Sequence, residues 1–280
     1  MTTLYEPAYA KVNLTLDVLD KRPDGYHDLQ SVMQTISLRD DIEIDVGTGK
    51  PWELRCTNEN IPCDESNLAW KAARVYCDAM KKDPGGLEIR ITKRIPSQAG
   101  LGGGSSDAAS TLVALNNMFE LGKSKQELVA IAARLGSDVP FFVYGGACVI
   151  GGMGEEVIPL EPVTSYRIAI IKHKAGLSTK DVFNKFDEMP MPNGVTCEEF
   201  IRLFNNENKE LHKSLFNSLE PAALSLCPSI VEAKKEMEAL GAVGVMMSGS
   251  GTSVFGLFND VEVYTRAVEK NKNNPDFWGL

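Results

Sequence analysis

The chain has 280 residues, of which 43% are hydrophobic and 24% are charged, and its net charge is −9. These proportions exclude a disordered chain, and the length suffices for one large domain or two modest ones. The acidic balance argues against a protein that binds nucleic acid over a broad surface, although an anionic small molecule needs only a few local positive groups.

The six cysteines and three histidines are scattered, and no Cys-x-x-Cys pair is present. The spacing of a zinc site is therefore missing. The first residues do not resemble a signal peptide, and no apolar run approaches the roughly twenty residues of a membrane span. We expect a cytoplasmic protein with free thiols, a monomer or weak homodimer, with no membrane contact and no nucleic-acid partner.

Alternation of apolar and polar residues predicts strands that gather early in the chain. These strands are expected over residues 5–19, 28–38, 41–46, 52–56 and 87–91, with a turn at 22–25. Helical spacing predicts helices over residues 67–81 and 108–115, and a third from the capping box at Ser124 to Leu135. A hairpin-like pair of strands is expected around residues 151–154.

The stretch Pro159–Pro162 predicts a boundary between an N-terminal domain, residues 1–160, and a C-terminal domain, residues 161–280. Strands are then expected over residues 166–171, 243–247 and 253–258, and helices over 178–186, 197–205, 209–217, 229–240 and from about Asp260. Because the strands do not alternate strictly with helices, the pattern indicates an α+β fold.

The most distinctive stretch is PSQAGLGGGSSD, from Pro96 to Asp107, in which four of twelve residues are glycine. It lies between an expected strand and an expected helix. Glycines let backbone N–H groups approach a ligand closely, and a helix N-terminus adds unpaired donors and the positive end of a dipole. This order predicts a phosphate site. The alternative is a flexible loop with a helix cap, which would need far less glycine.

The hydroxyls of Ser105 and Ser106 can cap the following helix or reach a phosphate or a metal. The stretch is not a P-loop, because no Lys precedes Ser105. It is not the dinucleotide motif either, since the third glycine and the tight strand-to-helix turn are absent. No His-Arg-Asp or Asp-Phe-Gly of a protein kinase is present.

Two further positions have open alternatives. Lys11, Asn13 and Thr15 share one face of the first strand, which can be a solvated face or a catalytic one. Asp138 precedes Val139 and Pro140, where it can be a helix N-cap or a proton acceptor.

The glycine-rich stretch resembles the Pro-x-x-x-Gly-Leu-Gly-Gly-Gly-Ser-Ser signature of the GHMP kinase superfamily of small-molecule kinases. The similarity runs over nearly the whole chain, and its motifs are AYAKVNL at 8–14, RPDGYH at 22–27, the loop at 96–109, LGSDVPFF at 135–142, NSLEP at 217–221 and MSGSGTS at 247–253. Several ordered motifs are far more specific than one loop. The resemblance implies a two-lobed α+β fold with the active site in the cleft between the lobes.

The resemblance further implies that ATP is bound by Pro96, Gly100, Leu101, Gly102, Gly103, Gly104, Ser105 and Ser106. It implies Lys11 and Asp138 as the catalytic pair, and Asn13 as a substrate-binding residue that can donate a hydrogen bond nearby. ATP chemistry requires Mg²⁺, for which Ser106 is the candidate ligand.

Within the superfamily, the motifs are most similar to the branch whose alcohol substrate carries a cytidine diphosphate group. That similarity implies that Tyr26 and His27 bind the cytosine and that Phe183 contacts its other face. Taken alone, Tyr26 and His27 can be ordinary turn residues, and Phe183 can be a core residue. The nearest alternative is a homoserine or mevalonate kinase. The turn that contains Tyr26 and His27 argues against it. The second alternative is a nucleotide-binding regulator without turnover. The presence of both Lys11 and Asp138 argues against it.

Overall fold

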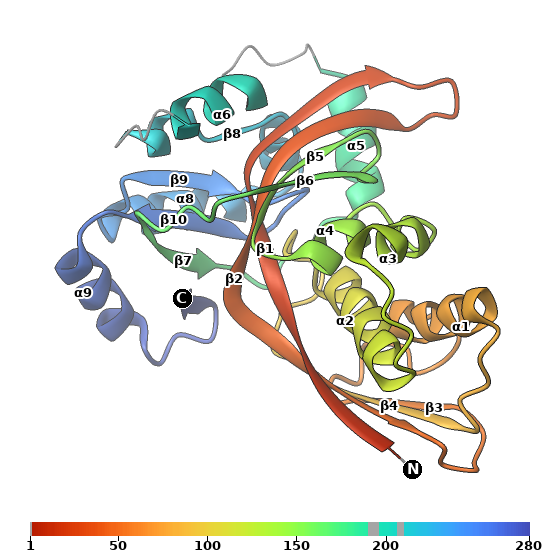
Figure 1. Cartoon of the computed structure of the whole chain (residues 1–280). Helices are drawn as coiled ribbons and strands as arrows, with labels where there is room; N and C mark the ends of the chain where they lie inside the picture. Colours follow the sequence, from red (N-terminus) through yellow and green to blue (C-terminus); the bar gives the residue numbers. More distant parts are fainter. Residues whose placement is uncertain (1, 190–195, 206–209) are drawn as a thin grey trace.

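The computed structural model describes residues 2–189, 196–205 and 210–280. They form two sheets with helices packed on them, and the two resulting lobes meet along the long antiparallel strands β1 (Thr2–Lys21) and β2 (His27–Val46) (Figure 1). The second sheet packs on the middle of these strands, where Val12 and Val32 share a core with Phe255.

The first lobe contains the larger sheet. Its other strands are β3 (Glu53–Cys56), β4 (Leu87–Thr92), β5 (Ala147–Gly151), β6 (Glu156–Leu160) and β8 (Phe216–Asn217). Their order is β3-β4-β2-β1-β8, while β5 pairs with a separate part of β2 and β6 pairs with β5. The lobe's helices are α1 (Leu68–Met80), α2 (Gly103–Met118), α3 (Lys125–Ala132) and α4 (Val139–Tyr144). Alternate residues of β2 and β4, among them Ile44 and Ile89, face α1 and α2 and bury a shared apolar core.

The second lobe is built on the antiparallel sheet β11-β7-β10-β9. Its strands are β7 (Arg167–Ile171), β9 (Gly244–Met247), β10 (Val254–Phe258) and β11 (Phe277–Gly279). Its helices are α5 (Thr179–Asp187), α6 (Cys197–Asn205), α7 (Glu220–Leu226), α8 (Ser229–Ala239) and α9 (Val261–Asn271), with a 3₁₀ turn at Leu211–Ser214. Strand β10 is buried on both faces: Phe255 and Leu257 face β1 and β2, and Val254 and Phe258 face the helices. This explains why its sequence is continuously apolar.

The predicted α+β class is confirmed, and most expected elements are present within two or three residues of their predicted bounds. Three expectations differ. Residues 28–46 form one strand, not two. Residues 211–217 form a 3₁₀ turn followed by a strand that pairs with β1, not a helix, while Lys209 lies outside the described residues. The helix after the glycine loop begins at Gly103, five residues earlier than expected.

The chain passes from the first sheet to the second between Leu160 and Arg167. Strand β8 returns to the first sheet, so one segment of the C-terminal half of the chain belongs to the first lobe. The division into domains 1–160 and 161–280 stays a prediction.

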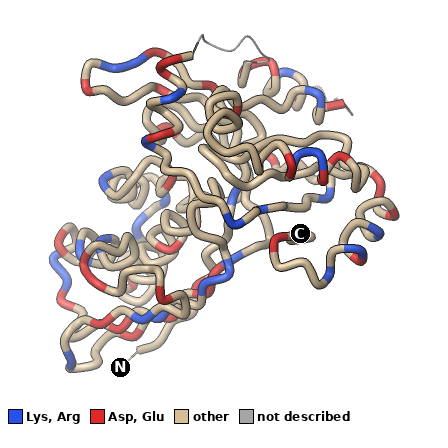
Figure 2. Tube along the Cα trace, turned by 180° about the vertical axis from the view of Figure 1, so that it is seen from behind, with Lys and Arg blue, Asp and Glu red and all other residues tan. Residues whose placement is uncertain are grey.

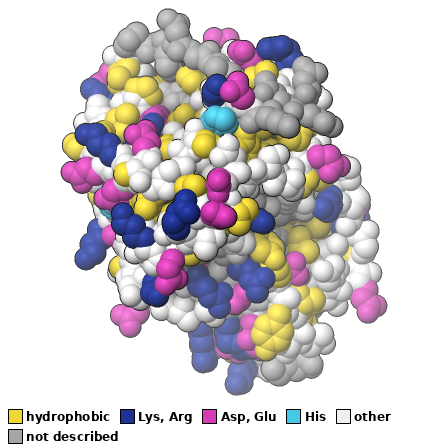
Figure 3. Space-filling model, turned by 90° about the vertical axis from the view of Figure 1, so that its left-hand side faces the viewer, with side chains coloured by type: hydrophobic (Ala, Val, Ile, Leu, Met, Phe, Trp, Pro, Cys, Tyr) yellow, Lys and Arg dark blue, Asp and Glu magenta, His cyan; other side chains and the backbone are white. Residues whose placement is uncertain are grey.

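Charged side chains of both signs are interspersed along the chain, and acidic and basic groups are mixed on the face shown by the space-filling view (Figures 2 and 3). Over the part of the chain that the structure describes, no helix is long and apolar enough to span a membrane.

Candidate active site

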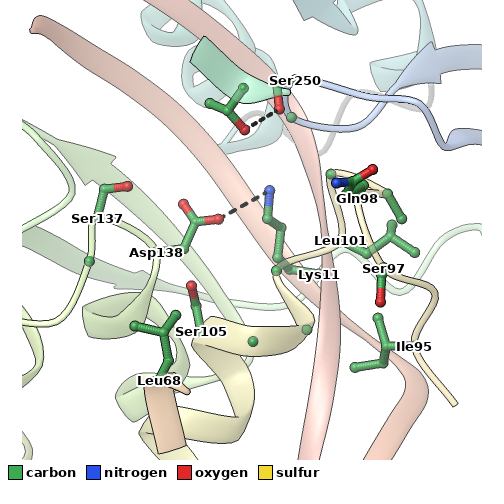
Figure 4. Close-up of a pocket in the computed structure, with 18 of the residues that line it drawn as sticks. Lys11, Leu68, Ile95, Ser97, Gln98, Leu101, Ser105, Ser137, Asp138 and Ser250 are labelled. Carbon is green, nitrogen blue, oxygen red and sulfur yellow. Dashed lines mark hydrogen bonds and ion pairs between the residues drawn. The ribbon is translucent and has the colours of Figure 1, made fainter. Parts of the chain in front are cut away.

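A cavity of about 730 Å³ lies between the glycine-rich loop, strand β1 and the segment before α4 (Figure 4). Of the residues predicted to bind ATP, only Ser106 does not line it; Pro96, Gly100, Leu101, Gly102, Gly103, Gly104 and Ser105 all do. Lys11, Asn13, Asp138 and Phe183 line the same cavity. Tyr26 and His27 are not among its lining residues.

The glycine-rich loop ends in a helix start that no side chain caps. Gly102 is the N-cap of α2 at φ 72°, a conformation that favours glycine, and a Cβ there would lie 2.6 Å from the Phe142 ring. Ser105 and Ser106 therefore lie inside the first turn, so the expectation that they cap the helix is wrong. The first N–H groups of α2 have no intrahelical acceptors and lie at the cavity, where they can bind an anion.

The loop also contacts the second lobe. The hydroxyl of Ser248 donates to the Gly100 carbonyl at 3.0 Å, and a Cβ on Gly100 would lie 2.0 Å from the Ser248 carbonyl oxygen. The Ser253 N–H donates to the Ala99 carbonyl at 3.1 Å. The turn between β9 and β10 thus holds the loop at Ala99 and Gly100.

Lys11 is buried, so the alternative that its strand face is solvated is wrong. Register shifts in the β1–β2 pairing after Tyr9 and after Asn13 flank this part of β1, and such bulges re-aim side chains. The Lys11 ammonium donates to Asn13 Oδ1 at 2.6 Å and lies 3.6 Å from Asp138 Oδ2 (Figure 4). Burial lowers the pKa of Lys11, and the nearby Asp138 carboxylate offsets part of that shift.

Asn13 is held in place by its other polar groups. Its side-chain amide donates to the Ser31 hydroxyl at 2.9 Å, and its backbone N–H donates to Ser248 Oγ at 3.3 Å. These bonds fix Oδ1 as the acceptor that faces Lys11, so the Asn13 side chain orients the ammonium toward the cavity.

Asp138 stands at the N-cap position of α4, but its side chain makes no capping hydrogen bond. Its carboxylate points toward Lys11 instead (Figure 4). The side chain is 30% exposed, against 3% for Lys11. Asp138 is therefore the accessible member of the pair, open to a molecule in the cavity, while Lys11 approaches it from inside the protein.

At the α5 side of the cavity, the His27 ring stacks on Phe183 with centroids 5.5 Å apart, and its Nε2 pairs with Asp187 Oδ1 at 2.8 Å. Phe183 lines the cavity and His27 lies behind it. Tyr26 is 68% exposed in the neighbouring turn. The role of these three residues in binding cytosine stays a prediction.

The Ser106 hydroxyl is buried and donates to the Tyr9 carbonyl at 2.7 Å, whereas Ser105 lines the cavity. A metal role for Ser106 stays a prediction, although this hydroxyl already has a structural partner. Across residues 2–189, 196–205 and 210–280, no cluster of three or more His, Cys, Asp or Glu side chains could hold a metal ion.

Comparison with known proteins identifies the family of this chain. The model of the N-terminal domain of GHMP kinases matches residues 67–146, and the model of the C-terminal domain matches residues 197–273. The 4-diphosphocytidyl-2-C-methyl-D-erythritol kinase of Clostridium beijerinckii is 40% identical over 91% of this chain and 90% of its own length. That of Geobacter sulfurreducens is 40% identical over 96% of this chain and 95% of its own length. The chain belongs to this family of GHMP kinases.

The fold is likewise that of the family. A solved 4-(cytidine 5'-diphospho)-2C-methyl-D-erythritol kinase superposes with a TM-score of 0.79 at 34% identity, covering 98% of this chain and 97% of that one. The homoserine kinase of Cytophaga hutchinsonii, at 20% identity and a TM-score of 0.73, shares the fold. The predicted family and two-lobed fold are confirmed, and as a GHMP kinase the chain uses ATP as co-substrate.

Several cavity residues were not predicted from the sequence. They are Ile61, Pro62 and Asn67 before α1, Leu68 at its first position, Lys93 and Asp107 around the loop, and Thr179 and Ser250 at the second lobe. The Asn67 side chain caps α1 and donates to the Pro62 carbonyl at 2.8 Å, a local signal that the sequence contained. The Thr179 and Ser250 hydroxyls lie 2.9 Å apart, a contact between distant segments that no local pattern indicates.

Proposed function

We propose that this chain transfers the γ-phosphoryl group of ATP to the 2-hydroxyl of 4-diphosphocytidyl-2-C-methyl-D-erythritol, a step of the non-mevalonate route to isoprenoid precursors. The observation that supports this most is the placement of the Lys11–Asp138 pair in one cavity with the glycine-rich loop. The names of the relatives supply the identity of the alcohol.

In this reaction, Asp138 accepts the proton of the substrate hydroxyl while the oxygen attacks the γ-phosphorus. The bond from that phosphorus to the bridging oxygen of ADP breaks, and ADP leaves with the electron pair. The Lys11 ammonium stabilises the negative charge that develops on the attacking oxygen and holds Asp138 in place. Because Asn13 orients Lys11, it contributes without exchanging a proton.

The uncapped start of α2, with Gly102, Gly103 and Gly104, binds the phosphates. Ser105 lines the same cavity, and its hydroxyl would be the protein's oxygen donor to Mg²⁺, which retains waters and phosphate oxygens in most kinase sites. When bound, Mg²⁺ neutralises phosphate charge.

The cytidine end of the substrate lies toward α5 in this proposal. Phe183 supplies a ring on the cavity wall, and His27, held by Asp187, supports that ring from behind. Tyr26 is exposed beside them and is free to cover the base. The RPDGYH turn therefore selects the substrate.

A coupled assay of ADP release tests the proposal. We expect turnover with 4-diphosphocytidyl-2-C-methyl-D-erythritol and none above background with homoserine or mevalonate. Preference for either of the latter would assign the chain to another activity of the superfamily. ATP binding by calorimetry without turnover on any of the three would instead favour a nucleotide-binding regulator.

A further inference from the structure

The turn between β5 and β6, residues 152–155, packs directly on the chain just before α4. At its closest point the backbone of Gly154 meets the peptide group between Ser137 and Asp138. A Cβ on Gly154 would lie 2.0 Å from the Ser137 carbonyl oxygen and 2.7 Å from the carbonyl carbon. The φ of Gly154 is 111°, a conformation that residues with a side chain rarely adopt. Both the space and the backbone conformation therefore require glycine here.

The turn is fixed to the strands of the first sheet. Strand β5 pairs with residues 31–34 of β2, and the Leu29 N–H donates to the Gly152 carbonyl at 2.8 Å. Strand β2 in turn pairs with β1 along the segment that carries Lys11. The hairpin also contacts α4, beside which it lies (Figure 1). The turn is thus an extension of the same strands that position the lysine of the catalytic pair.

Asp138 depends on its backbone for its position, because few contacts hold its side chain. The carboxylate makes no capping bond to α4, lies 3.6 Å from Lys11 Nζ and is 30% exposed. Ser137 and Asp138 follow each other in the segment that faces β1 across the cavity (Figure 4). The peptide that Gly154 touches leads directly into Asp138, so a shift of this peptide moves the carboxylate relative to Lys11.

We propose that Gly154 is a positioning residue for phosphoryl transfer, which holds the peptide between Ser137 and Asp138 where the carboxylate meets the substrate hydroxyl. The inference rests on the proposed function, since it requires Asp138 to accept the proton. Through β2, β5 and the turn, the sheet that carries Lys11 also supports the chain at Asp138, so one frame sets the spacing of the pair. Residues 152–155 do not line the cavity, so their effect is on kcat and not on nucleotide binding.

Gly154→Ala tests the contact. Its methyl group must displace the Ser137 carbonyl, and a misplacement of about 1 Å at the reacting groups costs a large factor in rate. We expect kcat to fall at least about tenfold and KM for ATP to stay within about twofold of the parent.

Gly146→Ala is the matched control. Gly146 precedes β5, at the opposite end from the turn, and its φ is 68°. A Cβ there meets nothing within 4 Å, so the substitution introduces backbone strain near the same strand without touching the Asp138 segment. This variant should keep the parental kcat.

A double-mutant cycle with Asp138→Asn separates positioning from general damage. The readout is substrate-dependent ADP release, measured at high enzyme concentration in the Asp138→Asn background. A change that merely loosens the protein lowers turnover by the same factor in both backgrounds. If Gly154 acts through the Asp138 carboxylate, Gly154→Ala should lower the residual turnover of Asp138→Asn by less than about threefold.

A second variant removes the contact without adding strain. Replacement of residues 152–155 by the two-residue turn Asn-Gly closes the same hairpin, because Gly151 pairs with Glu156 at its end. It should lower kcat at least about tenfold in the parent and less than about threefold in Asp138→Asn. Thermal melting shows which variants fold, and this replacement enters the cycle if Gly154→Ala does not fold.

Parental kcat in a folded hairpin variant, or an equal loss in the two backgrounds, would overturn the inference and leave the proposed kinase function intact. A loss in Gly146→Ala as large as that in Gly154→Ala would overturn it as well. Turnover of Asp138→Asn at the parental level would instead overturn the role of Asp138 as proton acceptor, and the inference with it.

Discussion

The backbone of Gly249, from the second lobe, packs against the Lys11 ammonium of the first. A Cβ at Gly249 would lie 3.2 Å from Lys11 Nζ and 3.0 Å from the Gly100 carbonyl oxygen, and its φ is 56°. Lys11 is therefore enclosed by the turn between β9 and β10 as well as by its own strand. Asn217 holds that turn, because its side-chain amide donates to the carbonyls of Met247 and Gly249, each at 2.9 Å.

Gly249→Ala should lower kcat at least tenfold, because the methyl group displaces the Lys11 ammonium or the loop carbonyl, and a misplacement of about 1 Å costs a large factor in rate. The melting temperature should fall only a few degrees, since the strain is confined to one turn. Steady-state kinetics and thermal melting measure the two effects. Parental kcat in the folded variant would show that Lys11 does not depend on this contact.

Asp138→Asn should retain the fold and ATP affinity while kcat falls about 10²–10⁴-fold, the usual contribution of a group that accepts a proton. The side chain makes no capping bond to α4, so no helix contact is lost. Coupled ADP release gives kcat, and calorimetry gives ATP affinity. Turnover within threefold of the parent would remove Asp138 from the chemistry.

Gly104→Val should weaken ATP binding more than tenfold with little effect on stability. A Cβ at this position meets only the Leu68 side chain, at 3.7 Å, and both residues line the cavity. The added methyl groups therefore fill space that the nucleotide needs, without backbone strain. Gly104→Ala is the graded comparison and should lose less. Titration with ATP and with the cytidine substrate separates the sites, and an equal loss for both would indicate general misfolding.

Tyr26→Ala should raise KM for the cytidine substrate about tenfold and leave KM for ATP unchanged, since stacking on a base contributes about 1–3 kcal/mol in nucleic-acid binders. Because Tyr26 is exposed, its loss should not change the melting temperature. Phe183→Ala should raise the same KM but also destabilise the protein, because Phe183 packs on the core of the second lobe. A rise in KM for ATP instead would reverse the assignment of the two ends of the cavity.

On the alkaline side of its pH profile, kcat/KM should decline at a pH lower than 10.5, which is the ordinary pKa of lysine. Burial lowers the pKa of Lys11, so its ammonium loses the proton at a lower pH than an exposed lysine does. Only the charged form stabilises the attacking oxygen, so activity declines as pH rises through that value. Lys11→Arg should move the decline to higher pH in whatever activity remains. If kcat/KM of the parent declined only at or above pH 10.5, the decline could not be assigned to the buried Lys11.

The sequence by itself determined the features that depend on residues close together in the chain. The glycine-rich stretch from Pro96 to Ser106, the capping box at Ser124 and the alternation of β1 were all predictable, since glycine, serine and apolar spacing act on the local backbone. The ordered motifs then identified the family.

Only the tertiary structure decided which polar residues are buried and what they face. Lys11 could not be distinguished from a solvated lysine, because its burial comes from Gly249 and Leu101, which lie far away in the chain. Two strands were predicted over residues 28–38 and 41–46, yet β2 continues through Asp40, because Lys93 and two loop N–H groups satisfy its carboxylate. Such partners are supplied by packing between distant segments, and local sequence patterns contain no information about them.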